Sequence, residues 1–163
     1  MNKHLNELFK ACIENATEEE LEVLTSVLSG FQKKQKQINS SYIGGLLHME
    51  RTIHDEICEL TVPLSPLLHN SLGIVHGGMT ATVIDSAMGT LANSLLPDGF
   101  SAVTTQLNIH YLSIGNGEFL QCKAHIDHKG TKTMVISADV YRSDKKKIAQ
   151  ATGSFFIIKK KNQ

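Results

Sequence analysis

The sequence lacks a net charge. Its 16 Lys and Arg residues balance 16 Asp and Glu residues, and the isoelectric point is about 7.1. This balance argues against a protein whose main partner is nucleic acid, because such proteins carry an excess of basic side chains against phosphate. The sequence also has no long hydrophobic run, and residues 1–7 lack the apolar core of a signal peptide. We therefore expect neither a membrane span nor a secretory signal.

Cysteine is scarce and does not form a recognisable pattern. Cys12, Cys58 and Cys122 are odd in number and far apart, and none belongs to a C-x-x-C pair. This spacing argues against a disulfide framework and against a zinc site. The histidines show no metal-binding spacing such as H-E-x-x-H. We expect no metal and no redox cofactor, and a cytoplasmic location.

Residues 1–40 predict a helical extension. Leu5, Leu8 and Cys12 follow helical spacing, and Thr17 with Glu20 has the form of a capping box at the start of a second amphipathic helix. A DNA-binding helix-turn-helix is the alternative. However, residues 1–40 hold five Lys and six Glu, with the acids clustered at the turn, which favours a packing or dimerisation role.

Residues 41–163 predict one α+β domain. Residues 42–49 and 53–63 are strand-like, and 79–96 read as one long helix that ends at Pro97-Asp98-Gly99. Residues 103–111 alternate polar and apolar side chains with a period of two. Further strands are expected near 120–126, 134–140 and 149–158, joined by short turns. We therefore expect an antiparallel meander packed on one long helix.

The segment His76-Gly77-Gly78 stands directly before this helix. Glycine allows close approach to the backbone, and the first amides of a helix have no partner inside it. Such an end can hold an anion or an oxyanion. Between Ile74 and Gly117 the only charged residues are Asp85 and Asp98, so Asp85 lies in the helix without a basic neighbour. A carboxylate base and an amide oxyanion donor together suggest acyl transfer.

The spacing of these two groups predicts a dimer. Eight helical residues separate Gly77 from Asp85, which is about 12 Å. Gly77 and Asp85 of the same chain therefore cannot both reach one carbonyl carbon. If both act, Gly77 comes from one subunit and Asp85 from the other, and a two-fold axis creates two such sites.

The run from Asn70 through His76-Gly77-Gly78 to Asp85 resembles the hotdog-fold acyl-CoA thioesterases of the phenylacetic-acid-degradation (PaaI-like) type. The later runs 104–113 and 148–153 also match that family, so the resemblance covers roughly residues 45–158. It implies a hotdog fold, in which an antiparallel sheet wraps around one long helix. It also implies an acyl-CoA thioesterase, a homodimer or homotetramer that needs no cofactor because coenzyme A is part of the substrate.

The resemblance also implies roles for individual residues. Asp85 matches the catalytic carboxylate, which acts as general base on water or as nucleophile, and Gly77 matches the oxyanion donor. Asn70, His76 and Thr104 match residues that line the site or position water. The residues expected to bind substrate or CoA are Gly78, Tyr111, Ser113, Lys129, Gly130 and Lys132.

The residues themselves leave simpler interpretations open. His76 could cap the helix, Asn70 could be a turn residue, and Thr104 could be present as a strand former. Lys129 and Lys132 could be solvated turn residues. Two other functions also stay open, namely a non-catalytic acyl-CoA binding or sensing protein and a dehydratase of β-hydroxyacyl thioesters with the same fold.

Overall fold

The computed structural model describes residues 2–160, so the outer ends of both predicted domains, residue 1 and residues 161–163, lie outside the described part. The chain forms two compact units, Met1–His48 and Met49–Gln163. The sequence places the boundary after residue 40, and the structural division falls after residue 48. The difference arises because helix α3 (Tyr42–Leu46) packs on helix α2 (Glu18–Gln35) of the first unit.

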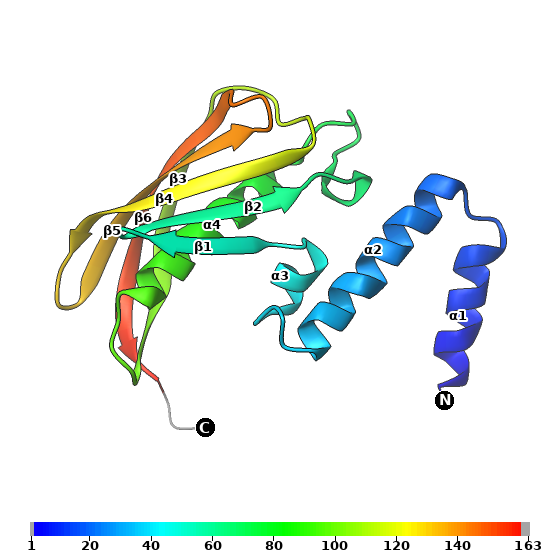
Figure 1. Ribbon diagram of the computed structural model, residues 1–163, viewed down its shortest axis with the longest axis horizontal. Coiled ribbons are helices and arrows are strands. Elements are labelled where there is room, and N and C mark those ends of the chain that lie inside the picture. Colours follow the sequence, from blue (N-terminus) through cyan, green and yellow to red (C-terminus); the bar gives the residue numbers. More distant parts are fainter. Residues whose placement is uncertain (1, 161–163) are drawn as a thin grey trace. The chain divides into compact units, whose positions relative to one another are not determined.

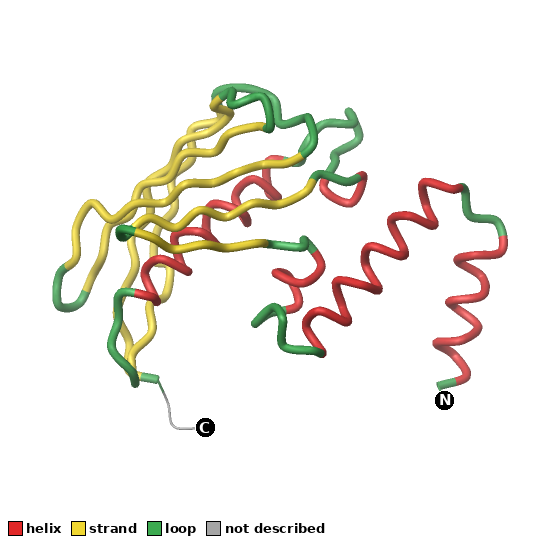
Figure 2. The backbone as a smooth tube through the Cα atoms, in the orientation of Figure 1, coloured by secondary structure: helices red, strands yellow, loops and turns green. Residues whose placement is uncertain are grey.

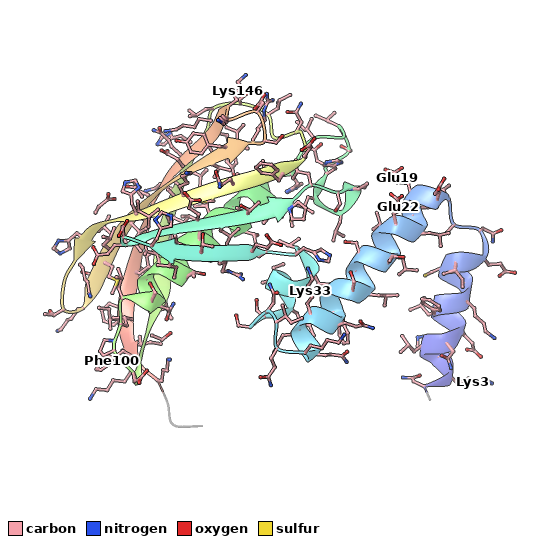
Figure 3. The ribbon with its side chains drawn as sticks, viewed as in Figure 1. Lys3, Glu19, Glu22, Lys33, Phe100 and Lys146 are labelled. Carbon is pink, nitrogen blue, oxygen red and sulfur yellow. The ribbon has the colours of Figure 1, made fainter. Side chains whose placement is uncertain are left out.

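The first unit contains the predicted pair of helices, α1 (Lys3–Glu14) and α2. The capping box is present as predicted: the Thr17 hydroxyl accepts from Glu20 N–H, and the Glu20 carboxylate accepts from Thr17 N–H. Figure 3 shows Glu19 and Glu22 in the first part of α2 and Lys33 toward its other end. This order of charges suits the helix macrodipole.

Residues 42–46 form a helix, so the strand predicted over 42–49 is wrong. The Ser41 hydroxyl accepts from Gly44 N–H at 3.1 Å and starts α3. Gly45 packs directly against Gly30 of α2. A Cβ built on either glycine would lie 2.5–2.6 Å from the carbonyl oxygen of the other. This close backbone contact between two helices overrides the strand-like composition of the segment.

The second unit is an antiparallel sheet that curves around one helix, α4 (Gly77–Ser94), as Figure 1 shows. Within the described residues the sheet has six strands in the order β1-β2-β4-β5-β6-β3. Their bounds are β1 (Glu50–His54), β2 (Ile57–Pro63), β3 (Phe100–Tyr111), β4 (Phe119–Lys129), β5 (Thr133–Arg142) and β6 (Lys147–Lys159). The expected α+β class is confirmed, and Figure 2 shows helix α4 against the strands, with a short 3₁₀ helix, η1 (Pro66–Leu68), in the same unit.

Two details of the sheet differ from the prediction. Only β4, β5 and β6 form a meander; β3 pairs with β6 at the sheet edge, and β4 pairs with β2. In addition, residues 53–63 are not one strand, because the chain reverses at Asp55-Glu56, where φ is 49° and 59°. Positive φ at both positions is characteristic of a type I′ hairpin turn.

The core lies between α4 and the inner face of the sheet. Val83, Ile84, Met88 and Leu91 of α4 are fully buried, as are sheet residues that include Phe155. Apart from the buried Thr80, the polar side chains of α4 are at least partly exposed, so their face of the helix is the one that a ligand can approach. Within residues 2–160 we find no helix with the length and apolar character needed to cross a bilayer.

Candidate active site

His76 caps helix α4. Its Nδ1 accepts a hydrogen bond from Gly78 N–H at 2.9 Å, and its backbone carbonyl accepts from Met79 and Thr80. Because Nδ1 is an acceptor here, the neutral ring carries its proton on Nε2. His76 is exposed, and its Nε2 has no hydrogen-bond partner within residues 2–160, so this nitrogen is free to donate to a ligand.

Gly77 is the first residue of α4, and its amide is free. In residues 2–160 the Gly77 N–H donates no hydrogen bond, whereas the three amides that follow all have acceptors. Its carbonyl oxygen accepts from the Tyr111 hydroxyl at 2.8 Å. The free N–H at the positive end of a helix has the properties of an oxyanion donor.

Asp85 lies eight residues further along α4, and its carboxylate accepts a 2.7 Å hydrogen bond from the Thr104 hydroxyl of β3. The helical neighbours of Asp85, which are Ala81, Met88 and Ala92, predict an inward-facing, buried acid. Asp85 is instead partly exposed, at the margin of the buried face. It lies at this margin because β3 is the edge strand beside it. One oxygen is held by Thr104, and the partly exposed carboxylate remains open to water.

A β-bulge in β3 aims Thr104 at Asp85. Leu107 pairs with Gly153 on the inner face, so strict alternation would turn Val103 inward and Thr104 outward. The register shifts between Thr104 and Gln106, where the strand has one extra residue. As a result Thr104 pairs with the buried Phe155 and faces α4, whereas Val103 pairs with the exposed Phe156. Bulges commonly redirect side chains next to active sites.

Asn70 organises the loop before α4. Its side-chain oxygen accepts from Leu72 N–H at 2.9 Å and from Ile74 N–H at 3.4 Å. The side-chain oxygen of Asn70 therefore acts as expected of a turn residue. The side-chain NH₂ group of Asn70 donates no hydrogen bond within residues 2–160. The loop it shapes leads directly to His76, whose N–H donates to Leu68 O.

The predicted CoA-binding residues fall into two groups. Gly78, Tyr111 and Ser113 lie at or near the start of α4, since Tyr111 contacts Gly77 and Ser113 follows two residues later. Lys129 instead ends β4, and Gly130 and Lys132 lie in the β4–β5 turn that follows it. The Lys129 ammonium donates to Leu95 O just beyond the other end of the helix, about 27 Å from Gly77 along its axis. One chain does not bring the two groups together.

The structure also shows a link between α4 and β3 that is not among the sequence predictions. Asn93 accepts hydrogen bonds from Ser101 Oγ at 2.6 Å and Ala102 N–H at 3.1 Å, and so joins the last turn of α4 to the start of β3. Gly77, Asp85 and Asn93 are spaced eight residues apart, and each contacts β3. The eight-residue spacing is the feature of the sequence from which the contact of Asn93 with β3 could have been predicted.

Other reactive groups in the described residues do not form a second centre. Burial raises the pKa of the Cys58 thiol to about 11 and raises that of Cys122 still further, so neither is a thiolate nucleophile at neutral pH. Cys12 is the exposed cysteine. Within residues 2–160 no group of three or more His, Cys, Asp or Glu side chains is placed to hold a metal ion.

The part of the chain that contains this site is similar to known proteins. The family model described as the Thioesterase superfamily matches residues 72–149, which include the start of α4, Asp85 and Thr104. The chain is 36% identical to acyl-coenzyme A thioesterase 13 of Mus musculus over 85 residues, 52% of this chain and 59% of the mouse protein. The match therefore spans less than two thirds of that relative's length.

Solved structures resemble the chain over a larger part of its length. The BH2602 protein of Bacillus halodurans, crystallised with CoA, is 39% identical, with a TM-score of 0.88 over 94% of this chain and 99% of that one. The PaaI protein of E. coli shares the fold, at 20% identity and a TM-score of 0.68 over 81% of this chain and 95% of its own. The expected fold and family are thus confirmed, and the chain belongs to the thioesterase superfamily with the hotdog fold.

Proposed function

We propose that the protein hydrolyses an acyl-CoA thioester to a free carboxylic acid and CoA. The observation that carries this proposal is the pair of groups on α4, a free Gly77 amide at its start and a partly exposed Asp85 held by Thr104. The name of the mouse relative and the CoA in the Bacillus halodurans crystal support coenzyme A as the thiol portion of the substrate.

In the proposed reaction Asp85 accepts a proton from water while the water oxygen attacks the thioester carbonyl carbon. The carbonyl π electrons move to oxygen, and the Gly77 N–H stabilises the resulting oxyanion. When the carbonyl re-forms, the C–S bond breaks, and the proton held by Asp85 passes to the departing CoA sulfur. His76 Nε2–H and the Asn70 amide are further donors for the thioester or the water.

The proposed site is shared between two chains. Gly77 and Asp85 are about 12 Å apart along one helix, so each carbonyl needs a second copy to supply one of them. The edge strand β3 supports this assembly, because the backbone groups on its outer side have no strand partner among the described residues. We propose a homodimer through β3, as such or as half of a tetramer. In this assembly the β4–β5 turn of one chain contacts CoA bound to the other chain, through Lys129, Gly130 and Lys132.

We also propose that the protein works in the cytoplasm. Cys12, Cys58 and Cys122 are all free thiols in the described structure. Free thiols at these positions suit a reducing compartment.

The test is a hydrolysis screen with short-chain, long-chain and aromatic acyl-CoAs, followed by Asp85→Asn. This substitution keeps the size and hydrogen-bonding shape of the side chain but removes its basicity. We expect kcat to fall by at least about 100-fold with the assembly intact. Asp98→Asn is the matched control, since Asp98 is the other acid between Ile74 and Gly117. Equal activity of Asp85→Asn and wild type would refute the proposal.

A further inference from the structure

One peptide unit at the start of α4 is held at both ends. The Tyr111 hydroxyl donates to the Gly77 carbonyl at 2.8 Å, and the N–H of the same peptide unit, which belongs to Gly78, donates to His76 Nδ1 at 2.9 Å. A chain of hydrogen bonds therefore runs from Tyr111 through the Gly77–Gly78 peptide to His76. The peptide lies directly after the free Gly77 N–H.

Tyr111 is well suited to this contact. It is the last residue of β3 and points to the same inner side as Leu107 and Ile109. Its ring lies beside Gly77, since a Cβ built on that glycine would be 3.6 Å from ring atoms and from the hydroxyl oxygen. The hydroxyl proton is used within the chain, so it is not available to donate to a substrate.

We propose that Tyr111 is a positioning residue for the oxyanion donor, in place of the direct substrate contact expected from the sequence. Tyr111 and His76 fix the Gly77–Gly78 peptide from both sides, and thereby fix the direction of the adjacent Gly77 N–H. This inference rests on the proposed thioester hydrolysis. It is independent of the proposed dimer, because Tyr111, His76 and Gly77 belong to one chain.

The physical reason is preorganisation. An oxyanion donor accelerates the reaction only if it already points at the place where charge develops, so that no reorganisation is needed during the reaction. Glycine at both Gly77 and Gly78 gives this backbone more freedom than any other pair of residues would. Hydrogen bonds at both ends of the peptide remove that freedom, and bonds in a chain polarise one another.

The experiment compares Tyr111→Phe with Tyr141→Phe. Both remove one tyrosine hydroxyl from a strand of the same sheet, but the Tyr141 hydroxyl contacts Asp139, 3.3 Å away, and not α4. With the acyl-CoA that wild type hydrolyses best, we expect Tyr111→Phe to lower kcat about tenfold at nearly unchanged KM, because the lost contact acts mainly in the transition state. Tyr141→Phe should match wild type.

A spectroscopic measurement separates positioning from a general structural effect. The Raman carbonyl stretch of the same acyl-CoA is recorded bound to Asp85→Asn, in which turnover is slow, and bound to Asp85→Asn with Tyr111→Phe. A polarised carbonyl has a lower stretching frequency, so we expect the double variant to shift it back toward the value in solution.

The outcomes distinguish the two levels of the proposal. If wild type hydrolyses acyl-CoA and Asp85→Asn does not, but Tyr111→Phe keeps both kcat and the carbonyl frequency, the role of Tyr111 is refuted and the proposed function stands. A rise in KM alone would instead assign Tyr111 to substrate binding and also overturn the inference. If wild type hydrolyses no acyl-CoA, the proposed function fails, and the inference fails with it.

Discussion

At the scale of single residues, the hydroxyl of Thr104 is the group that orients the proposed base. It donates to Asp85 at 2.7 Å and occupies one of the two carboxylate oxygens. A carboxylate held in this way loses rotational freedom, and its second oxygen is directed at a fixed point. Thr104 therefore matters for the geometry of Asp85 in the free chain, before any substrate binds.

Thr104→Val tests this role, because valine has nearly the same shape and no hydroxyl. We expect kcat to fall about tenfold, since a positioned base is replaced by a mobile one. Thr104→Ser should keep most of the activity because it restores the hydroxyl. The comparison is made by steady-state kinetics together with the melting temperature of each variant. Similar kcat values for valine and serine would show that the hydrogen bond is not needed.

The sequence indicates these residues but not their geometry. The resemblance names Thr104, whereas its own alternation with Leu107 would place that side chain on the outer face. The bulge that reverses this depends on how β3 pairs with β6, some 50 residues later in the chain. Local periodicity contains no information about such pairing. For His76 and Asn70 the sequence allows capping or turn roles as well as roles in the site. Their hydrogen bonds show that His76 caps the helix and that Asn70 shapes the loop.

At the scale of elements, strongly periodic segments were predictable and short ones were not. The long helix and the strands from β3 onward follow clear patterns, so their existence matches expectation. Helix α3 was missed because its sequence, Tyr-Ile-Gly-Gly-Leu, contains poor helix formers. What stabilises it is the contact of Gly45 with Gly30, which is separated from it in sequence and visible only after α2 and α3 pack.

The β1–β2 turn offers a prediction about stability. Asp55 and Glu56 both have positive φ, which costs a residue with a Cβ about 1 kcal/mol. Asn-Gly is the preferred pair for such a turn. We expect the double change Asp55→Asn with Glu56→Gly to raise the melting temperature by a few degrees, measured by calorimetry.

The control for this prediction is Thr52→Gly in the adjacent strand β1, where φ is not positive and glycine adds only chain entropy. That variant should melt at a lower temperature than wild type. A turn variant that also melts lower would show that the side chains of Asp55 and Glu56 contribute more than their backbone strain costs.

At the scale of the whole molecule, a shared site makes a prediction that no single-chain site makes. Gly77→Pro removes the proposed oxyanion donor while suiting the fold, because proline is favoured at the first helical position. His76 before it already has extended backbone angles, φ −63° and ψ 132°, which a following proline requires. We expect this variant to be nearly inactive but folded.

Mixing Gly77→Pro with Asp85→Asn then tests the shared site. In a mixed dimer one site contains both defects and the other has an intact Gly77 and an intact Asp85. After unfolding and refolding together, two inactive variants should regain about one quarter of wild-type activity, since half of the dimers are mixed. Gly77→Ala, which keeps the N–H, is the active control. No recovery, with mixed dimers shown by mass spectrometry, would place both groups of each site in one chain.

The exposed thiol of Cys12 has a practical consequence for all of these measurements. Dyes that report CoA release do so by reacting with its sulfur, and they will also modify Cys12, while burial protects Cys58 and Cys122. Each protein molecule then contributes a background signal equal to one product molecule, which would hide slow turnover in the weakest variants. Introducing Cys12→Ser into every variant removes that background, and the remaining signal then measures the CoA released by hydrolysis.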